Sequence, residues 1–237
     1  MSQPPVNVGV PQRLVPELER RVLAFWAEEL CVDVGALDRD GLVVVSDPRD
    51  FAAARRATIR TARGTLLLAA PVEADGAATE AGAYAADVAA HPRGIGLLHY
   101  RATAPNGDPD PRIGVLSGAD RALLDALQEA AGADATEEAD VDVEHTLAVG
   151  IVEDNRLVAI ASLLDEVETA VDVGVLVDPV ARRRGLGAAV VADVTRRAVS
   201  SGRLVQYRCN DENEASAALA RSCGFALWGV LTVASLP

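Results

Sequence analysis

Three apolar runs rich in β-branched residues follow one another between residues 146 and 177, and they limit the fold more than any other feature. The runs are TLAVGIVE, LVAIASLL and AVDVGVLV. The segment DNR between the first two is typical of a β-hairpin, and DEVET turns the chain into the third. Asp178 and Pro179 end the third run, because proline cannot donate a hydrogen bond to a ladder. The region therefore predicts a meander of three strands.

The chain after the meander alternates between helix and strand signals. Leu186, Val190 and Val194 fall on one face of a helix that Gly202 ends. LVQYRC predicts a strand, residues 213–224 a helix, and LWGVLTVA a last strand. The expected order over this half of the chain is βββαβαβ, a mixed α/β (α+β) arrangement.

The first half of the chain predicts a smaller α/β unit. A helix begins at Pro16, strands are expected over 41–46, 65–71 and 95–102, and helices over 51–62 and 73–91. The stretch TAPNGDPDPR (103–112) is typical of a linker. We therefore expect a loosely ordered lead-in over 1–12, an α/β domain over 13–110 and a second domain over 111–237. The acidic stretch 133–145 predicts a solvated loop.

Composition narrows the function classes. The net charge is −13, and all 22 basic residues are arginine. An acidic chain repels phosphates, which argues against a nucleic-acid partner and mildly favours a cationic one such as an amine. No run approaches the roughly 18 apolar residues of a membrane span, and the N-terminus does not resemble a secretory signal. Three cysteines without a CxxC pair indicate small core residues in a reducing cytoplasm, with no zinc site.

A loop with three successive arginines joins the meander to the following helix. Its sequence is VARRRGLGAAV (180–190). Gly185 and Gly187 let the backbone approach a ligand, and the N–H groups of the first helical turn point at the same place. A pyrophosphate suits such a loop. The alternative is a turn flanked by arginines whose glycines only tighten the joint between strand and helix.

The stretch VDVGVLVDPVARRRGLGAAVV resembles the acyl-CoA-binding motif of the GNAT N-acetyltransferase superfamily. In that motif a strand with a splayed end leads into R/Q-x-x-G-x-G/A and a helix, and here the motif is Arg182-x-x-Gly185-x-Gly187. NEASAALARSCGF resembles the next helix of the superfamily. The resemblance covers about residues 112–237. It implies a GNAT-like mixed sheet flanked by helices, preceded by the smaller α/β domain.

The resemblance also implies which residues bind acetyl-CoA, the expected co-substrate. The main chain of residues 183–188 would hold the pyrophosphate, and the main chain of Val175 and Val177 would pair with the pantetheine arm. The full expected set is Val175, Leu176, Val177, Arg182, Arg183, Arg184, Gly185, Leu186, Gly187, Ala188, Asn213 and Ser216. The three arginines would be auxiliary cations, and capping of a helix explains Asn213 equally well. No metal is expected.

Acetyl transfer needs a neutral amine, and an alkylammonium is neutral in only about one molecule in 10³ at pH 7. By the resemblance, Asp172 is the expected catalytic base, in a strand position where the family usually has Glu. The alternative is a carboxylate on the surface of the strand. Glu168 and Glu166, in the preceding turn, are the second choices.

Ala220 stands where the family often has a tyrosine that protonates the leaving thiolate. Tyr207, Ser216 and Cys223 are the substitutes that the sequence offers. We therefore expect an enzyme, a cytoplasmic acyltransferase that moves an acetyl group from acetyl-CoA to a primary amine of a small molecule in a ternary complex. The alternative is a catalytically weakened acyl-CoA-binding regulatory module. A membrane partner is not expected, and a homodimer stays open.

Overall fold

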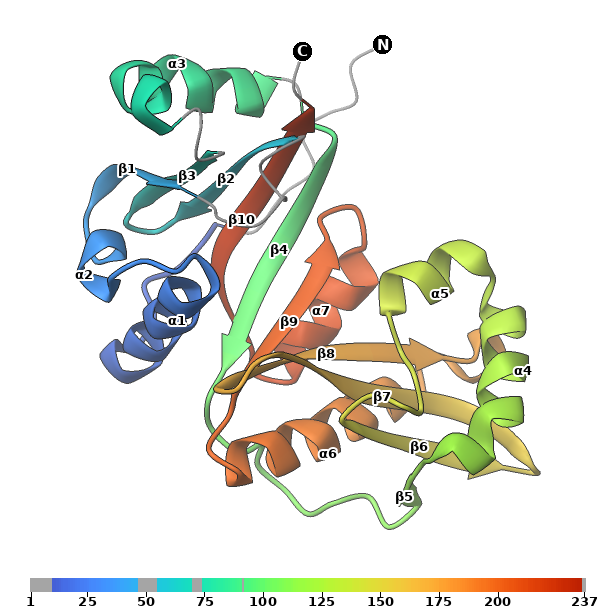
Figure 1. Cartoon of the computed structure of the whole chain (residues 1–237). Coiled ribbons are helices and arrows are strands. Elements are labelled where there is room, and N and C mark those ends of the chain that lie inside the picture. The colour runs from blue at the N-terminus through green and yellow to red at the C-terminus, as the bar shows by residue number, and fades with distance from the viewer. Residues whose placement is uncertain (1–9, 47–54, 70–73, 91, 236–237) are drawn as a thin grey trace. The chain divides into compact units, whose positions relative to one another are not determined.

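The computed structural model describes residues 10–46, 55–69, 74–90 and 92–235 (Figure 1). The chain forms two compact units. One consists of Met1–Tyr100, Arg208–Ala217 and Ala226–Pro237, and the other of Arg101–Tyr207 and Ala218–Phe225. Most of the lead-in expected over 1–12 lies outside the described residues. The domain boundaries expected after residues 12 and 110 stay predictions, because a compact unit need not fold independently.

The first unit contains a mixed sheet in the strand order β1-β3-β2-β10-β4. The pair β1/β3 is parallel, and the other neighbours are antiparallel. The elements are α1 (Pro16–Glu29), α2 (Val34–Leu37), β1 (Gly41–Ser46), β2 (Arg55–Thr61), β3 (Gly64–Ala69), α3 (Ala74–Ala90), β4 (Gly94–Arg101) and β10 (Ala226–Ser235).

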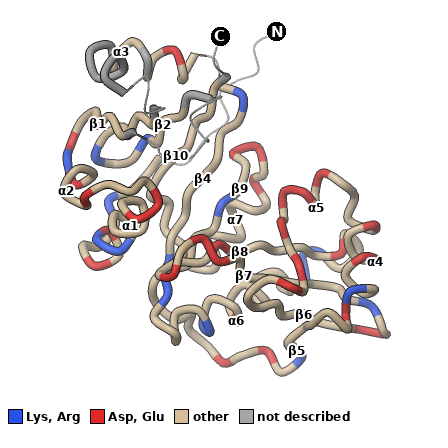
Figure 2. Tube along the Cα trace, in the orientation of Figure 1, with Lys and Arg blue, Asp and Glu red and all other residues tan. Residues whose placement is uncertain are grey.

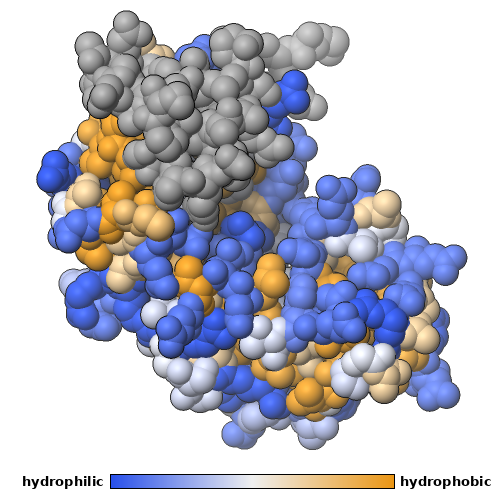
Figure 3. Space-filling model, in the orientation of Figure 1, coloured by the Kyte–Doolittle hydropathy of each residue, from blue (hydrophilic) through white to orange (hydrophobic). Residues whose placement is uncertain are grey.

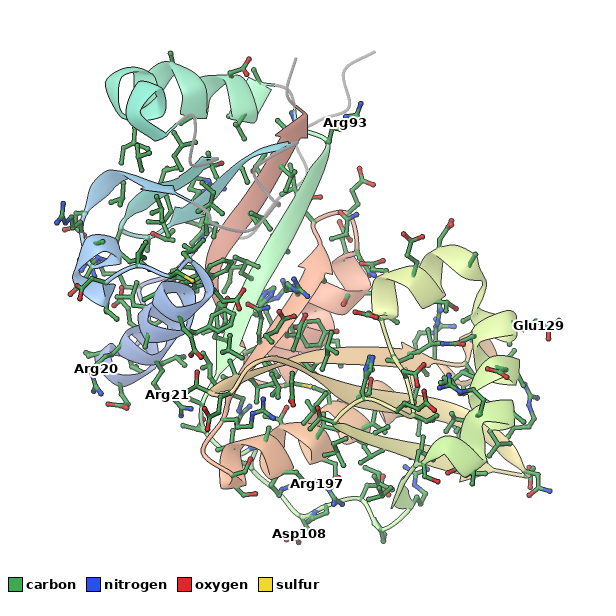
Figure 4. The ribbon with its side chains drawn as sticks, viewed as in Figure 1. Arg20, Arg21, Arg93, Asp108, Glu129 and Arg197 are labelled. Carbon is green, nitrogen blue, oxygen red and sulfur yellow. The ribbon has the colours of Figure 1, made fainter. Side chains whose placement is uncertain are left out.

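Aromatic side chains fill the core of this unit beneath α1. Trp26 stacks on Trp228 with ring centroids 6.0 Å apart, and its Nε1–H donates to the Tyr100 hydroxyl at 2.9 Å. Tyr100 is fully buried, so this hydrogen bond satisfies two groups that burial would otherwise penalise. Arg20 and Arg21, labelled in Figure 4, project from α1. The two tryptophans are thus core residues.

The helix expected over 51–62 is wrong for the described part of that range. Residues 51–54 lie outside the described residues, and Arg55–Thr61 forms strand β2. This strand pairs with β3 on one side and with β10, from the far end of the chain, on the other. Its strand partners therefore override the local preference of an alanine- and arginine-rich run.

The second unit contains the mixed sheet flanked by helices that the sequence predicts. Its strand order is β9-β8-β7-β6-β5; the pair β8/β9 is parallel and the other pairs are antiparallel. The three-strand meander is confirmed as β6–β8. The elements are β5 (Ile113–Val115), α4 (Arg121–Ala131), α5 (Ala133–Ala139), β6 (Leu147–Glu153), β7 (Arg156–Val167), β8 (Ala170–Val177), α6 (Leu186–Ser200), β9 (Leu204–Asn210) and α7 (Glu214–Ser222). The end of β9 and the start of α7 fall within Arg208–Ala217, which belongs to the first unit.

Helices α4 and α5 cover one face of this sheet, and α6 covers the other (Figure 1). Leu124 and Leu127 of α4 pack with Leu176 of β8 in one buried cluster. On the opposite face α6 buries its apolar stripe, which includes Leu186, Val190 and Val194. Each such side chain contributes about 1.5–3 kcal/mol when it is fully buried.

The expectation of a loop over the acidic stretch 133–145 is wrong for its first half, because Ala133–Ala139 forms helix α5. Its acidic residues are marked on the tube in Figure 2. Ala135 and Ala139 pack against the core cluster, so burial of small apolar side chains stabilises this short helix despite its charge. On the face seen in Figure 3, hydrophilic side chains cover most of α5.

A close contact at Gly174 fixes α5 on the sheet. A Cβ atom there would lie 2.3 Å from the Ala139 carbonyl oxygen and 2.7 Å from that of Asp140. Gly174→Ala should therefore lower the free energy of unfolding by about 1–3 kcal/mol through overpacking. Gly114→Ala is the matched control, because Gly114 also lies in a strand and has nothing within 4 Å of its Cβ position. Urea unfolding measures both, and equal stabilities would contradict the contact.

Candidate functional site

Strand β8 loses its neighbour on one side before its end. Its antiparallel pairing with β7 runs from Ala170 to Val177, whereas its parallel pairing with β9 covers only Ala170–Leu204, Val171–Val205 and Asp172–Gln206. The two parallel strands thus diverge after Asp172. The last five residues of β8 form an extended main chain with one side open to a further strand-like partner.

The hydrogen bonding of β8 decides which residues face that open side. The Asp178 N–H donates to the Val158 carbonyl of the β7 side at 3.0 Å. In an antiparallel pair alternate residues bond to the same neighbour, so the even-numbered residues of β8 bond to β7. The main-chain groups of Val173, Val175 and Val177 therefore point away from β7.

Two of these three positions already have local partners. Asp172 Oδ1 accepts a hydrogen bond from the Val173 N–H at 3.1 Å, and the Val177 carbonyl accepts a long one from Arg182 Nε at 3.5 Å. Val175 lies between them. Among the described residues, no hydrogen bond to the Val175 main chain is found on this side.

The loop after β8 contains two residues with left-handed backbone, Arg183 with φ 63° and Gly185 with φ 77°. Glycine adopts that conformation without strain, whereas a β-branched residue there is an outlier. Gly187 is constrained by space instead, since its Cβ position lies 3.3 Å from Leu219 Cδ2 and 3.3 Å from Val177 Cγ2. The glycines thus serve different purposes, one in the turn and one in packing.

Helix α6 begins at the end of this loop, and the N–H groups of its first turn have no partner within the helix. Gly185 is the N-cap and supplies no side-chain bond, and the first turn contains no acidic residue. The first intrahelical bond runs from the Ala189 N–H to the Gly185 carbonyl, so Leu186, Gly187 and Ala188 have N–H groups without a helical acceptor. Gly185 is exposed, and Gly187 and Ala188 are half-buried. Such a helix start attracts an anion.

The three loop arginines differ in their contacts. Arg184 makes a bidentate ion pair with Glu153 of β6, with both N–O distances 2.9 Å, and its guanidinium holds the pKa of Glu153 below the ordinary value. Arg182 reaches the Val177 carbonyl. Arg183 is exposed. Arg184 is therefore engaged within the protein, a long-range pairing that no local sequence pattern predicts.

Asp178 anchors the loop at its start. It is 3% exposed, its Oδ1 accepts the Val180 N–H at 3.0 Å, and its Oδ2 accepts from Arg156 Nη2 at 2.9 Å. Pro179 follows at the first position of a short 3₁₀ turn. A buried carboxylate with two partners holds the turn that leads into the arginines.

Asp172 lies on the face of the sheet that α4 and α5 cover. It shares that face with Gly174, Leu176 and its cross-strand neighbours Leu164 and Gln206. Asp172 is half-buried, whereas Gln206 is 2% exposed. Gln206 is not among the predicted site residues, although it follows the apolar pair Leu204–Val205 as a polar residue.

Of the other candidate bases, Glu168 lies in the turn between β7 and β8, whereas the expectation of a turn is wrong for Glu166, which belongs to the end of β7. Glu168 is exposed and Glu166 is half-buried. Asn213 and Ser216 belong to the first unit, where the Asn213 side chain accepts the Ser216 N–H at 3.0 Å and so caps α7. The capping interpretation of Asn213 is therefore supported.

Ala220 is fully buried, and so is Tyr207, which packs edge-on against Phe225 at 5.6 Å. Burial raises the pKa of the Cys223 thiol, which keeps that thiol protonated at neutral pH. Cys209 and Cys223 are buried as expected, but the expectation is wrong for Cys31, which is exposed.

Two negative findings concern the described part of the chain only. It contains no group of three or more His, Cys, Asp or Glu side chains that could hold a metal ion. Within the same residues, no helix is both long and apolar enough to cross a bilayer.

Residues 119–225 match the model of a family described as acetyltransferase (GNAT) family. No protein of curated function matches the chain by sequence. The matched residues run from the start of α4 to the end of α7, so they include the divergent strand pair and the loop.

Two solved structures are similar in fold. A protein from Novosphingobium aromaticivorans assigned to the GNAT family of acetyltransferases is 23% identical, with a TM-score of 0.50; the match covers 61% of this chain and 66% of that one. A GNAT-family acetyltransferase from Colwellia psychrerythraea is 11% identical, with a TM-score of 0.51, over 94% of this chain and 76% of that one. This chain thus spans just under two thirds of the first structure.

The loop depends on Asp178, which gives a direct test. Asp178→Ala should lower the free energy of unfolding by roughly 1–2 kcal/mol, because it removes a cap and leaves Arg156 without its partner. Glu129→Ala is the control, since Glu129 is an exposed carboxylate on α4, labelled in Figure 4. Thermal unfolding of both variants decides, and equal melting temperatures would show that the loop does not need this anchor.

Proposed function

Because residues 119–225 of the chain belong to the GNAT family of acetyltransferases, we propose that the protein is an acetyl-CoA-dependent N-acetyltransferase. It transfers the acetyl group to a primary amine of a small molecule, which attacks directly in a ternary complex. The observation that carries this proposal is the divergence of β8 from β9 directly before an uncapped helix start. The family assignment does not favour the alternative of a regulatory acyl-CoA-binding module.

The residues around α6 fit the pyrophosphate of acetyl-CoA. The N–H groups of Leu186, Gly187 and Ala188 lack a helical acceptor, and the exposed Gly185 admits a phosphate without steric hindrance. The helix dipole adds about 0.3–1 kcal/mol for an anion there. Arg183 and Arg182 add positive charge, while Arg184 acts mainly through Glu153, which it holds beside the loop.

The open side of β8 fits the pantetheine arm, which carries amide groups that can pair as a strand does. Val175 would supply a main-chain donor and acceptor, and Val177 its N–H, with Leu176 between them turned into the core. Bound acetyl-CoA supplies an activated acetyl thioester. The chain's own contribution is to hold that thioester beside Asp172.

Asp172 is the proposed base, and it acts on the amine through water because its side chain is short. Its carboxylate is oriented by the Val173 N–H, at the point where β9 leaves β8. A carboxylate at this position takes the proton that the ammonium group must lose before attack. Glu168 is exposed in the turn and is the second candidate.

An amine acceptor agrees with the charge of the region. Acidic residues occupy α5 and the segment after it, among them Glu138, Asp140 and Glu144, and the net charge of the chain is −13 (Figure 2). Such a surface attracts a cation. The proposed location is the cytoplasm, which supplies acetyl-CoA and keeps thiols reduced.

The leaving thiolate would depart without the usual tyrosine. Ala220 is fully buried, and Tyr207 and Cys223 are buried as well, which leaves Ser216 as the half-buried hydroxyl among the substitutes. A thiolate is a tolerable leaving group near neutral pH, because free thiols have a pKa of roughly 8.5. The reaction therefore does not require a general acid.

Coenzyme A should raise the melting temperature of the protein, since a ligand that binds only the native state stabilises it by about 2.7 kcal/mol at 100 times its Kd. Gly185→Val should reduce this shift strongly, because valine cannot hold the φ of 77° that shapes the loop. Differential scanning fluorimetry with and without coenzyme A measures the shift.

Gly202→Val is the matched control for that test. Gly202 follows the end of the same helix with φ 84°. Like Gly185, it has no atom within 4 Å of the position that a Cβ atom would take. Both variants should lose similar intrinsic stability, but only Gly185→Val should lose the response to coenzyme A. Equal responses in the two variants would remove the loop from the binding site.

Asp172→Asn should lower kcat at pH 7 by roughly 100-fold, because the amide keeps the bond to Val173 but accepts no proton. The defect should shrink as pH rises toward the amine pKa of about 10.4, where the substrate is already neutral. Thiol release with a panel of amines measures the rate, with Glu168→Gln as the comparison. A larger loss of kcat in Glu168→Gln than in Asp172→Asn would show that Glu168, and not Asp172, is the base.

A further inference from the structure

Ser162 lies on the same face of the sheet as Asp172, and its hydroxyl contacts a histidine, His145. Ser162 Oγ lies 3.0 Å from His145 Nδ1. Ser162 is fully buried, whereas His145 is half-buried. A buried hydroxyl is thus bonded to the imidazole of a half-buried side chain.

The strand register places this pair next to Asp172. Ser162 pairs with Gly174, and Leu164 pairs with Asp172, so Ser162 and Asp172 occupy diagonal positions on one face. Diagonal Cα atoms lie about 7–8 Å apart, a distance that one water molecule between two side chains can bridge. Strand β6 begins at Leu147, opposite Leu163, so His145 enters beside the same stretch of β7.

A network of contacts holds His145 in this position. Arg121 of α4 makes a bidentate ion pair with Asp142, whose distance from Nη1 to Oδ2 is 2.8 Å. The Asp142 N–H donates to Ser162 Oγ at 3.3 Å, and the Glu144 N–H donates to Asp142 Oδ1 at 2.8 Å. The segment that carries His145 is therefore tied both to a helix and to the sheet.

The hydrogen-bond inventory of Ser162 gives the direction of the proton. A hydroxyl has one hydrogen and two lone pairs, and the Asp142 N–H occupies one lone pair. In the neutral tautomer with its hydrogen on Nε2, His145 accepts the Ser162 hydrogen at Nδ1. A proton that arrives at Ser162 Oγ from the site can then displace that hydrogen onto Nδ1.

We propose that Ser162 and His145 form a proton relay that removes the proton from the Asp172 carboxyl group during acetyl transfer. This proposal rests on the proposed function. The ammonium substrate gives one proton to the Asp172 carboxylate through water. That proton passes through a bridging water to Ser162 Oγ, the Ser162 hydrogen moves to Nδ1, and His145 releases its Nε2 hydrogen to solvent. One proton thus leaves the amine and one reaches bulk water. Asp172 and Ser162 regain their starting states, whereas His145 holds its hydrogen on Nδ1 until exchange with solvent restores the Nε2 tautomer.

The charges around His145 suit a proton acceptor. They are Asp142 and Glu144 on its own segment, Asp140 at the end of α5, Arg121 on α4 and Asp172 on β8. The hydrogen bonds from the Arg121 guanidinium hold the pKa of Asp142 below its usual value, so Asp142 stays charged near neutral pH. The relay functions when His145 is neutral.

The test is the pH dependence of kcat/KM between about pH 5.5 and 7.5, a range centred on the ordinary histidine pKa of about 6.5. A histidine that must be neutral contributes about a tenfold rise over that range. His145→Gln keeps a hydrogen-bonding side chain but cannot titrate, and Ser162→Ala interrupts the path while His145 remains. Both variants should lose this tenfold component.

Ser200→Ala is the control, because its hydroxyl bonds only locally to the Arg197 carbonyl at the end of α6. It should keep the wild-type profile. Two acceptor amines of different pKa separate the contributions, since the component that belongs to the substrate moves with the amine and that of His145 does not. A NMR titration of the His145 ring should give the same pKa as the kinetic component.

The outcomes separate the relay from the function on which it rests. If wild type releases no thiol with any amine, the proposed function fails and the relay with it. If wild type is active and the tenfold component persists in His145→Gln, only the relay is overturned. Loss of the component in both variants, with melting temperatures that show folded protein, supports the relay. A uniform loss of rate at every pH would mean that the pair only supports the structure.

Discussion

The divergence of two parallel strands leaves the main chain of β8 open on one side, and the candidate site of the second unit depends on this opening. Strands β8 and β9 pair as far as Asp172 and Gln206, and beyond that point β8 keeps only its β7 neighbour. An interior strand with an open side costs main-chain hydrogen bonds, and proteins keep such a gap where another chain or ligand completes the ladder. The same residue, Asp172, ends the pairing, orients its carboxylate on the Val173 N–H and faces the acidic helix α5.

The loop after β8 leads from this open strand directly into α6. Asp178 is buried with two partners, so the chain leaves β8 in one defined direction and reaches Gly185 in a left-handed conformation. The helix that follows starts without a side-chain cap, and its first N–H groups have no helical acceptor. An extended main chain with an open side and a helix start without a cap thus lie next to each other in sequence, and they suit the amides and the phosphates of the proposed acyl-CoA, respectively.

Sequence patterns predicted strands β6–β8, helix α6, strand β9 and helix α7 well, because each is decided by nearby residues. The alternation in AVDVGVLV gave β8 with its exact ends, and the Leu186–Val190–Val194 stripe gave α6. Contacts between residues far apart in the sequence could not be predicted from local patterns. Arg55–Thr61 became a strand because β10 pairs with it, and residues 133–139 became a helix because Ala135 and Ala139 meet the core. The ion pair of Arg184 with Glu153 and the bond of Ser162 with His145 join residues 31 and 17 positions apart, respectively.

In the proposed complex, acyl-CoA occupies the open side of β8 and the start of α6 together. Amide hydrogen exchange with and without coenzyme A, resolved by residue, measures this directly. Exchange should slow at Val175 and at Leu186, Gly187 and Ala188, for whose N–H groups the described residues offer no main-chain acceptor. Slowed exchange confined to other segments, or none at these four amides at saturating coenzyme A, would contradict it.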